Sequence, residues 1–150
     1  MIERRMFLIG GAAMSILVSC GPAGPGSVTV VAMGAAGMNP GPDGSDRPLT
    51  VQVIQMRGTG AFDGADFFAL QNPSAALGGD FISADQIALA PGGKATKVIG
   101  LDPAAAAIGF VAGFRDPAGK SFRAKSAVSA TATVTFAVEV GPGGLVLRPA

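Results

Sequence analysis

The stretch TVTFAVEV, residues 133–140, is the most regular pattern in the sequence. Apolar side chains occupy every second position in it, at Val134, Phe136, Val138 and Val140. The residues between them are polar, charged or small. This period of two is typical of a β-strand with one face in a hydrophobic core. The stretch therefore predicts a strand of a sheet that packs on one side.

Further strand-like segments lie throughout the chain. They are residues 28–33, 49–53, 88–90, 94–101, 108–114 and 145–148. A Pro91-Gly92-Gly93 turn between two of them predicts a strand pair. In residues 108–114, large side chains alternate with Gly109, Val111 and Gly113, which predicts packing against another sheet. About seven short strands without long crossover helices predict a mainly β fold, a two-sheet antiparallel β-sandwich.

Two short helices are expected to interrupt the strands. Asp63 can cap the first helix with Asp66 at its third position, while Phe62 meets Phe67 as a hydrophobic staple. Ser83 can cap the second in the same way, with Gln86 at its third position and Ile82 facing Ile87. The prediction therefore includes a small helical insertion. The aromatic group of Phe62, Phe67 and Phe68 is read as staple and core packing rather than as a ligand site.

The N-terminus has the three parts of an export signal. Arg4 and Arg5 are followed by a mainly apolar run of about 13 residues, 6 to 18, and then by Ser19 and Cys20. A membrane span needs about 20 apolar residues, so cleavage is expected instead. We predict a signal peptide over 1–19, a lipidated flexible tether over 20–27 and a β-sandwich domain over 28–150. Both the Sec and the twin-arginine export routes fit the paired arginines.

Leu17, Val18, Ser19 and Cys20 resemble the lipobox of bacterial lipoproteins, which predicts lipidation of Cys20. The alternative is a buried free cysteine. That alternative is disfavoured because glycines and prolines follow Cys20 and offer no element to pack in. Acyl chains on Cys20 would anchor the protein to a membrane. Gly21, in place of Asp, resembles an outer-membrane sorting signal.

The residue inventory argues against catalysis. The chain contains no His, Trp or Tyr and one Cys, which excludes thiol and imidazole metal sites and an internal disulfide. Without the signal, nine Lys plus Arg face nine Asp plus Glu, so no basic patch for nucleic acid is expected. Asp63 and Asp66 are read as helix N-terminal residues. Asp43 and Asp46 lack the spacing of a calcium loop. We expect no enzyme, metal, cofactor or small-molecule substrate.

Several segments resemble, in order, the outer-membrane lipoprotein of the type VI secretion system, the TssJ family, also called SciN or VasD. They are Asn39-Pro40, Arg47 to Met56, Phe62 with Ala65 to Leu70, Leu89 to Gly92, and Gly109 to Asp116. Phe122 before Arg123, where the family often has Trp, and Gly93, where an acidic residue often stands, depart from the pattern.

The resemblance implies a transthyretin-like sandwich with a non-enzymatic role. It implies a lipid anchor in the periplasmic face of the outer membrane and binding to the periplasmic C-terminal domain of the inner-membrane protein TssM, within a trans-envelope complex. The alternative is a generic periplasmic carrier or inhibitor lipoprotein that holds a small ligand or a protease. A lipid-tethered hydrolase has almost no support without His.

The predicted partner-binding site is the ten-residue loop between the first two strands. It consists of Gly37, Met38, Asn39, Pro40, Gly41, Pro42, Asp43, Gly44, Ser45 and Asp46. Hairpin loops usually have two to five residues, and a loop this long contributes little to a core. We expect Met38 to be its apolar anchor, with Asn39 and Pro40 holding the backbone. Replacing residues 38–46 by a short link is expected to preserve the fold.

Overall fold

The computed structural model describes residues 24–150, and eight strands form the body of this part. The strands are β1 (Ser27–Gly34), β2 (Leu49–Met56), β3 (Phe81–Leu89), β4 (Lys94–Gly100), β5 (Ala107–Ala112), β6 (Arg123–Ala127), β7 (Thr133–Gly141) and β8 (Gly144–Pro149). Between β2 and β3 lie the helices α2 (Gly60–Gly64), α3 (Phe67–Leu70) and α4 (Pro73–Leu77) and the 3-10 turn η1 (Gly78–Asp80).

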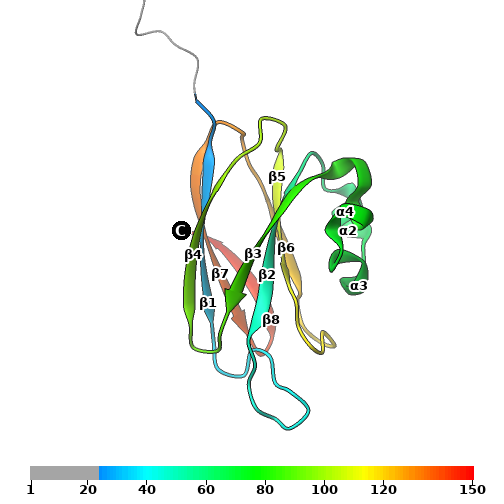
Figure 1. Ribbon diagram of the computed structural model, residues 1–150, viewed down its shortest axis with the longest axis vertical. Coiled ribbons are helices and arrows are strands. Elements are labelled where there is room, and N and C mark those ends of the chain that lie inside the picture. The colour runs from blue at the N-terminus through cyan, green and yellow to red at the C-terminus, as the bar shows by residue number, and fades with distance from the viewer. Residues whose placement is uncertain (1–23) are drawn as a thin grey trace, which may run out of the picture.

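The strands form two four-stranded sheets that face each other (Figure 1). The first sheet has the order β4-β1-β7-β8, and the second has the order β3-β2-β5-β6. Neighbouring strands are antiparallel except for β1 and β7, which pair in parallel with Val30 opposite Phe136. The mainly β, two-sheet sandwich predicted from the sequence is confirmed, with this one parallel pair added.

The alternating stretch of β7 supplies one wall of the core. Phe136, Val138 and Val140 are buried, as the period of two predicts. Phe136 meets Phe110 of the second sheet edge to face, with ring centroids 5.8 Å apart and planes at 72°. This arrangement is favourable for aromatic rings beyond the area that they bury. The two sheets are therefore joined at their centre by a pair of phenylalanines.

The second sheet has buried side chains on both faces. Its inner face packs on the first sheet, and its outer face is covered by the helices between β2 and β3 (Figure 1). At Gly109 of β5, an added Cβ would lie 2.7 Å from the Phe62 ring and 3.0 Å from the methyl carbon of Met56. The small face of β5 thus receives the helical insertion, while its large face lies against the other sheet as predicted.

Three polar side chains tie the layers together. Gln52, which is buried, donates from Nε2 to the carbonyl of Leu70 at 3.1 Å and so holds the helices to β2. Gln55, also buried, donates to the carbonyl of Gly100 at 3.0 Å. The Arg123 guanidinium donates to the carbonyls of Phe62, at 2.8 Å, and of Ala65. Periodicity alone could not reveal these bonds, since each partner is distant in sequence.

The predicted helix at residues 82–87 is wrong, because these residues belong to β3. Ile87 pairs with Val51 of β2, and backbone hydrogen bonds from that distant strand outweigh a local cap. The helix at residues 63–67 is also placed differently. Asp63 lies inside α2, and Asp66 is the cap of α3, with its carboxylate accepting from the Ala69 N–H at 2.7 Å.

Two other details differ from the sequence prediction. The Pro91-Gly92-Gly93 turn connects β3 and β4, but these strands lie in different sheets and do not form a hairpin. Strand β6 was not predicted, because Arg123 and Lys125 interrupt any apolar alternation at this sheet edge. Charged side chains on an edge strand are common, since they discourage pairing with another chain.

Phe136→Ala is expected to lower the free energy of unfolding by about 3–5 kcal/mol, because the lost ring would leave a cavity between the sheets. Phe68→Ala is the control: Phe68 is 76% exposed, and its loss is expected to cost no more than about 0.5 kcal/mol. Chemical denaturation measures both. A Phe136→Ala loss below about 1 kcal/mol would show that the inter-sheet ring contact does not hold the core.

Candidate functional site: a folded loop at one end of the sandwich

The loop of residues 37–46 extends from the end of the sandwich opposite to the end where the described chain begins (Figure 1). It is itself a small folded unit. Pro40 and Asp46 form an isolated antiparallel bridge, and the Gly41 N–H donates to the carbonyl of Ser45 at 2.7 Å. Gly44 lies at φ 82°, a left-handed conformation that favours glycine. The loop thus has a defined backbone.

The Asp46 carboxylate closes the base of the loop. Its two oxygens accept from the N–H groups of Gly37, at 2.6 Å, and Asn39, at 3.0 Å. These bonds, the one from Asn39 above all, hold the pKa of Asp46 below its ordinary value, although partial desolvation opposes them. Asp46 therefore closes the loop only in its charged form.

Asp43 plays a similar part at the tip. Its carboxylate accepts from the Ser45 hydroxyl at 2.7 Å and from the Ser45 N–H at 3.2 Å, and it pairs with Arg47 at 3.4 Å. The hydroxyl bond, followed by the N–H bond and Arg47, lowers the pKa of Asp43. Both aspartates of the loop thus serve as internal acceptors. Within residues 24–150, no group of three His, Cys, Asp or Glu side chains is placed to hold a metal ion.

The expectation that Met38 is an exposed anchor is wrong. Met38 is fully buried and belongs to the main core between the sheets. Asn39, next to it, is 5% exposed and donates from Nδ2 to the carbonyl of Pro48 at 3.0 Å. Removal of residues 38–46 would therefore open the core, so the predicted tolerance to that deletion does not hold either. As predicted, Asn39 holds the backbone of the loop.

A second segment, the connection of residues 113–122 between β5 and β6, lies against the loop. The Arg115 N–H donates to Oδ1 of Asn39 at 2.9 Å, and its Nε donates to the carbonyl of Pro40 at 3.0 Å. The Lys120 ammonium lies 3.5 Å from the Met38 carbonyl and 4.8 Å from the centre of the Phe114 ring. The sequence analysis missed this contact, because Asn39 and Arg115 are 76 positions apart.

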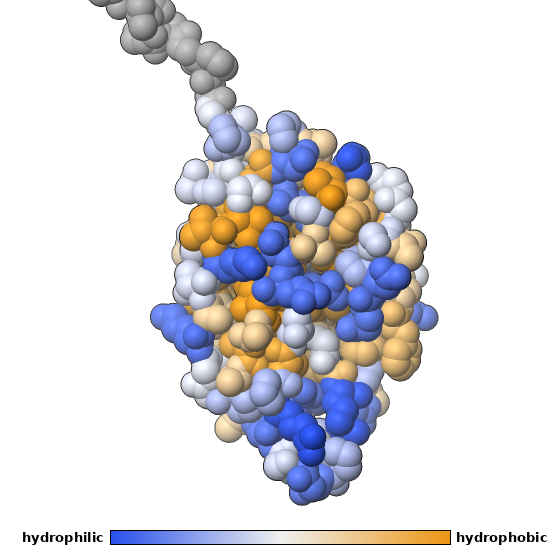
Figure 2. All heavy atoms as spheres, in the orientation of Figure 1, coloured by the Kyte–Doolittle hydropathy of each residue, from blue (hydrophilic) through white to orange (hydrophobic). Residues whose placement is uncertain are grey.

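The exposed part of the loop is its tip. Pro42, Asp43, Gly44 and Ser45 are all exposed, whereas Met38, Asn39 and Gly41 are buried. In Figure 2, hydrophilic residues gather at this lower end of the molecule. The surface that a partner can reach is therefore small and polar.

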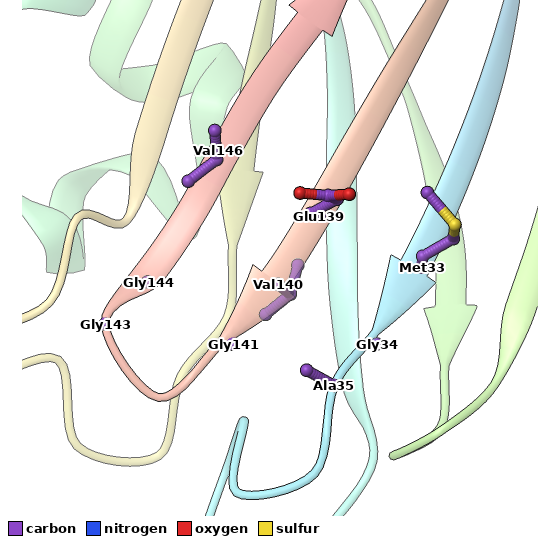
Figure 3. Close-up of a pocket in the computed structure, with 9 residues that line it drawn as sticks. All are labelled: Met33, Gly34, Ala35, Glu139, Val140, Gly141, Gly143, Gly144 and Val146. Carbon is purple, nitrogen blue, oxygen red and sulfur yellow. The ribbon is translucent and has the colours of Figure 1, made fainter.

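A shallow groove lies beside the base of the loop, on the outer face of the first sheet (Figure 3). Its volume is about 500 Å³, and a row of Met33, Glu139 and Val146 on three neighbouring strands crosses it. Glu139 pairs with Arg148 at 3.2 Å. The groove adjoins the loop, because the Ala35 N–H donates to the carbonyl of Val140 at 2.8 Å.

One protein-family model matches residues 27–143, and its description is type VI secretion lipoprotein, with the names VasD, EvfM and TssJ. The chain belongs to this family. Its fold class and family are therefore those that the sequence segments indicated. Comparison with curated proteins gave no match.

Three solved structures show the same fold. The type VI lipoprotein TssJ1 from Pseudomonas aeruginosa is 31% identical, with a TM-score of 0.74, over 85% of this chain and 99% of that chain. Lip from Serratia marcescens, described as a membrane-bound component of the type VI secretion system, is 22% identical, with a TM-score of 0.77, over 85% and 99%. A chain from a structure described as the TssM C-terminal domain from EAEC is 25% identical, with a TM-score of 0.66, over 83% and 98%.

Cys20 and the predicted signal peptide of this type VI secretion lipoprotein lie outside the described residues. From residue 24 onward, every helix is too short or too polar to cross a membrane. The aromatic group near α3 is mainly structural: Phe62 and Phe67 are buried, whereas Phe68 is exposed. The predicted loop is thus the candidate site, and residues 113–122 are its structural support.

Acidification is expected to open the base of the loop. The fold lowers the pKa of Asp46 below 3.8, so closure is complete above that pH and is lost as the pH falls through the lowered value. The amide NMR signals of Gly37 and Asn39 should shift with a midpoint below 3.8. In Asp46→Asn, which cannot titrate, that transition should be absent. A midpoint at or above 3.8 would show that the carboxylate does not accept these bonds.

Proposed function

We propose that this chain is an outer-membrane lipoprotein of the type VI secretion system without enzymatic activity. In this proposal, Cys20 carries the lipid on the periplasmic face, and the loop of residues 37–46 binds the periplasmic C-terminal domain of a TssM-like inner-membrane protein. That contact helps to assemble the complex that crosses the envelope. Family membership supports the secretion role, and the likeness to a chain from the TssM C-terminal domain structure supports the partner class.

The observation that carries the proposal is the position of the loop. Strand β1 runs from the end near Gly24 to the loop, so Cys20 and residues 37–46 approach opposite ends of the sandwich. An anchored sandwich would then present the loop away from the membrane, toward the periplasm. Because its backbone is already folded, binding would cost little conformational entropy.

Cys20→Ser is expected to release the protein from the membrane fraction or to stall it as a precursor, since the tether offers no other anchor. Fractionation of outer membranes, with the wild-type chain in parallel, measures this. Ser19→Ala, which keeps a small residue before the cysteine, is the matched control and should remain membrane-bound. Firm retention of Cys20→Ser in the outer membrane would contradict the lipid anchor.

Replacement of Pro42 to Ser45 by four Gly and Ser residues should weaken binding to the TssM-like domain by about tenfold or more, the equivalent of about 1.4 kcal/mol. The change leaves Met38, Asn39 and Asp46 in place, so the melting temperature should change little. Gly and Ser substitutions at Pro103 and Ala104, exposed residues at the other end of the sandwich, serve as the control. Wild-type affinity of the folded tip variant would place the contact elsewhere.

A further inference from the structure

The charges around the loop are used unequally. Asp43 and Asp46 accept hydrogen bonds within the loop, and Asp116 accepts from the Ala118 N–H at 3.1 Å. Among the cations, Arg47 pairs with Asp43, and Lys120 lies over Phe114 and near the Met38 carbonyl. The aspartates thus shape the backbone, and two of the three cations have local partners.

Arg115 is the exception. Its side chain is exposed, and within residues 24–150 no Asp or Glu oxygen lies within 4 Å of its guanidinium. Its Nε is held by the carbonyl of Pro40, while Nη1 and Nη2 have no hydrogen-bond partner among the described residues. The result is an immobilised guanidinium with free donors next to the loop.

We propose that Arg115 is the charged anchor of the docking surface and binds a carboxylate of the partner protein. The docking surface then consists of residues 37–46 together with residues 113–120, two segments that Asn39 and Arg115 lock together. This inference rests on the proposed function and adds a residue and a ligand chemistry to it. A guanidinium fixed at Nε presents its other N–H groups in a planar fork, which matches a carboxylate better than a lysine does.

A protein carboxylate fits this position better than a lipid phosphate. The site lies at the end of the sandwich far from Gly24, and the tether to Cys20 approaches the other end. The lock also reduces the entropy that an arginine side chain would otherwise lose on binding. Arg115 therefore offers an ordered charge where a periplasmic protein can reach it.

Arg115→Gln separates the charge from the lock. The Gln amide nitrogen occupies about the position of Nε and can still donate to Pro40, while the positive charge is removed. Binding to the periplasmic C-terminal domain of the cognate TssM-like protein should weaken about tenfold or more, with a smaller salt dependence between low and high NaCl. Arg115→Lys should bind more weakly than wild type but keep the wild-type salt dependence, because it keeps the charge and loses the fork.

Arg57→Gln is the matched control. Arg57 is an exposed arginine that also donates to carbonyls of another segment, those of Gly79 at 3.0 Å and Phe81 at 2.8 Å. It follows β2 at the opposite end of the sandwich, so its variant should bind as wild type does. Melting curves and the Gly37 and Asn39 amide signals report whether each variant keeps its fold and its loop.

The outcomes distinguish this inference from the proposed function. If the tip variant loses binding but Arg115→Gln keeps wild-type affinity and salt dependence, the anchor role is overturned and the loop assignment stands. If Arg115→Gln disturbs the loop signals and the affinity but not the salt dependence, Arg115 is only structural, which also overturns the proposal. Should Arg115→Gln fail to fold, Arg115→Lys decides: wild-type affinity in it overturns the fork.

Discussion

All six residues of β5 are buried, and this strand has no face in water. One face meets the first sheet through Phe110, and the other, narrowed by Gly109, receives the Phe62 ring. A strand at this position has to be covered twice, and the helices between β2 and β3 provide the second cover. Without them, Val111 and the outer side chains of β2 would be exposed.

The candidate site depends on the same strand. Directly after β5, the backbone N–H of Gly113 bonds to the carbonyl of Thr50 at 2.9 Å, and Phe114 is buried. Arg115 therefore leaves a fixed point, and its N–H meets Asn39 at a defined place. The position of the loop follows from core packing, not from the loop sequence alone. A core substitution near Phe114 is thus expected to act on the loop as well as on stability.

The sequence predicted best where one face of a strand alone decides burial. The alternation in residues 133–140 and in β2 reflects this, since each apolar side chain there has one possible destination. It failed at residues 82–87, where a local capping pattern competed with pairing to a strand about thirty residues earlier. It failed again at Met38, because a methionine in a Gly and Pro loop carries no periodicity that would indicate an inward side chain. Loop length alone, however, located the candidate site.

The topology also connects the proposed anchor to the candidate site mechanically. Strand β1 leads directly from the tether to the loop and is paired along its length with β4 on one side and with β7 on the other. Eight residues at about 3.3 Å each make it about 26 Å long. A pull between a lipid on Cys20 and a partner on residues 37–46 would act along the strand axis, in the direction that loads its lateral hydrogen bonds together. A central strand paired on both sides suits this position better than an edge strand, which has hydrogen bonds on one side only.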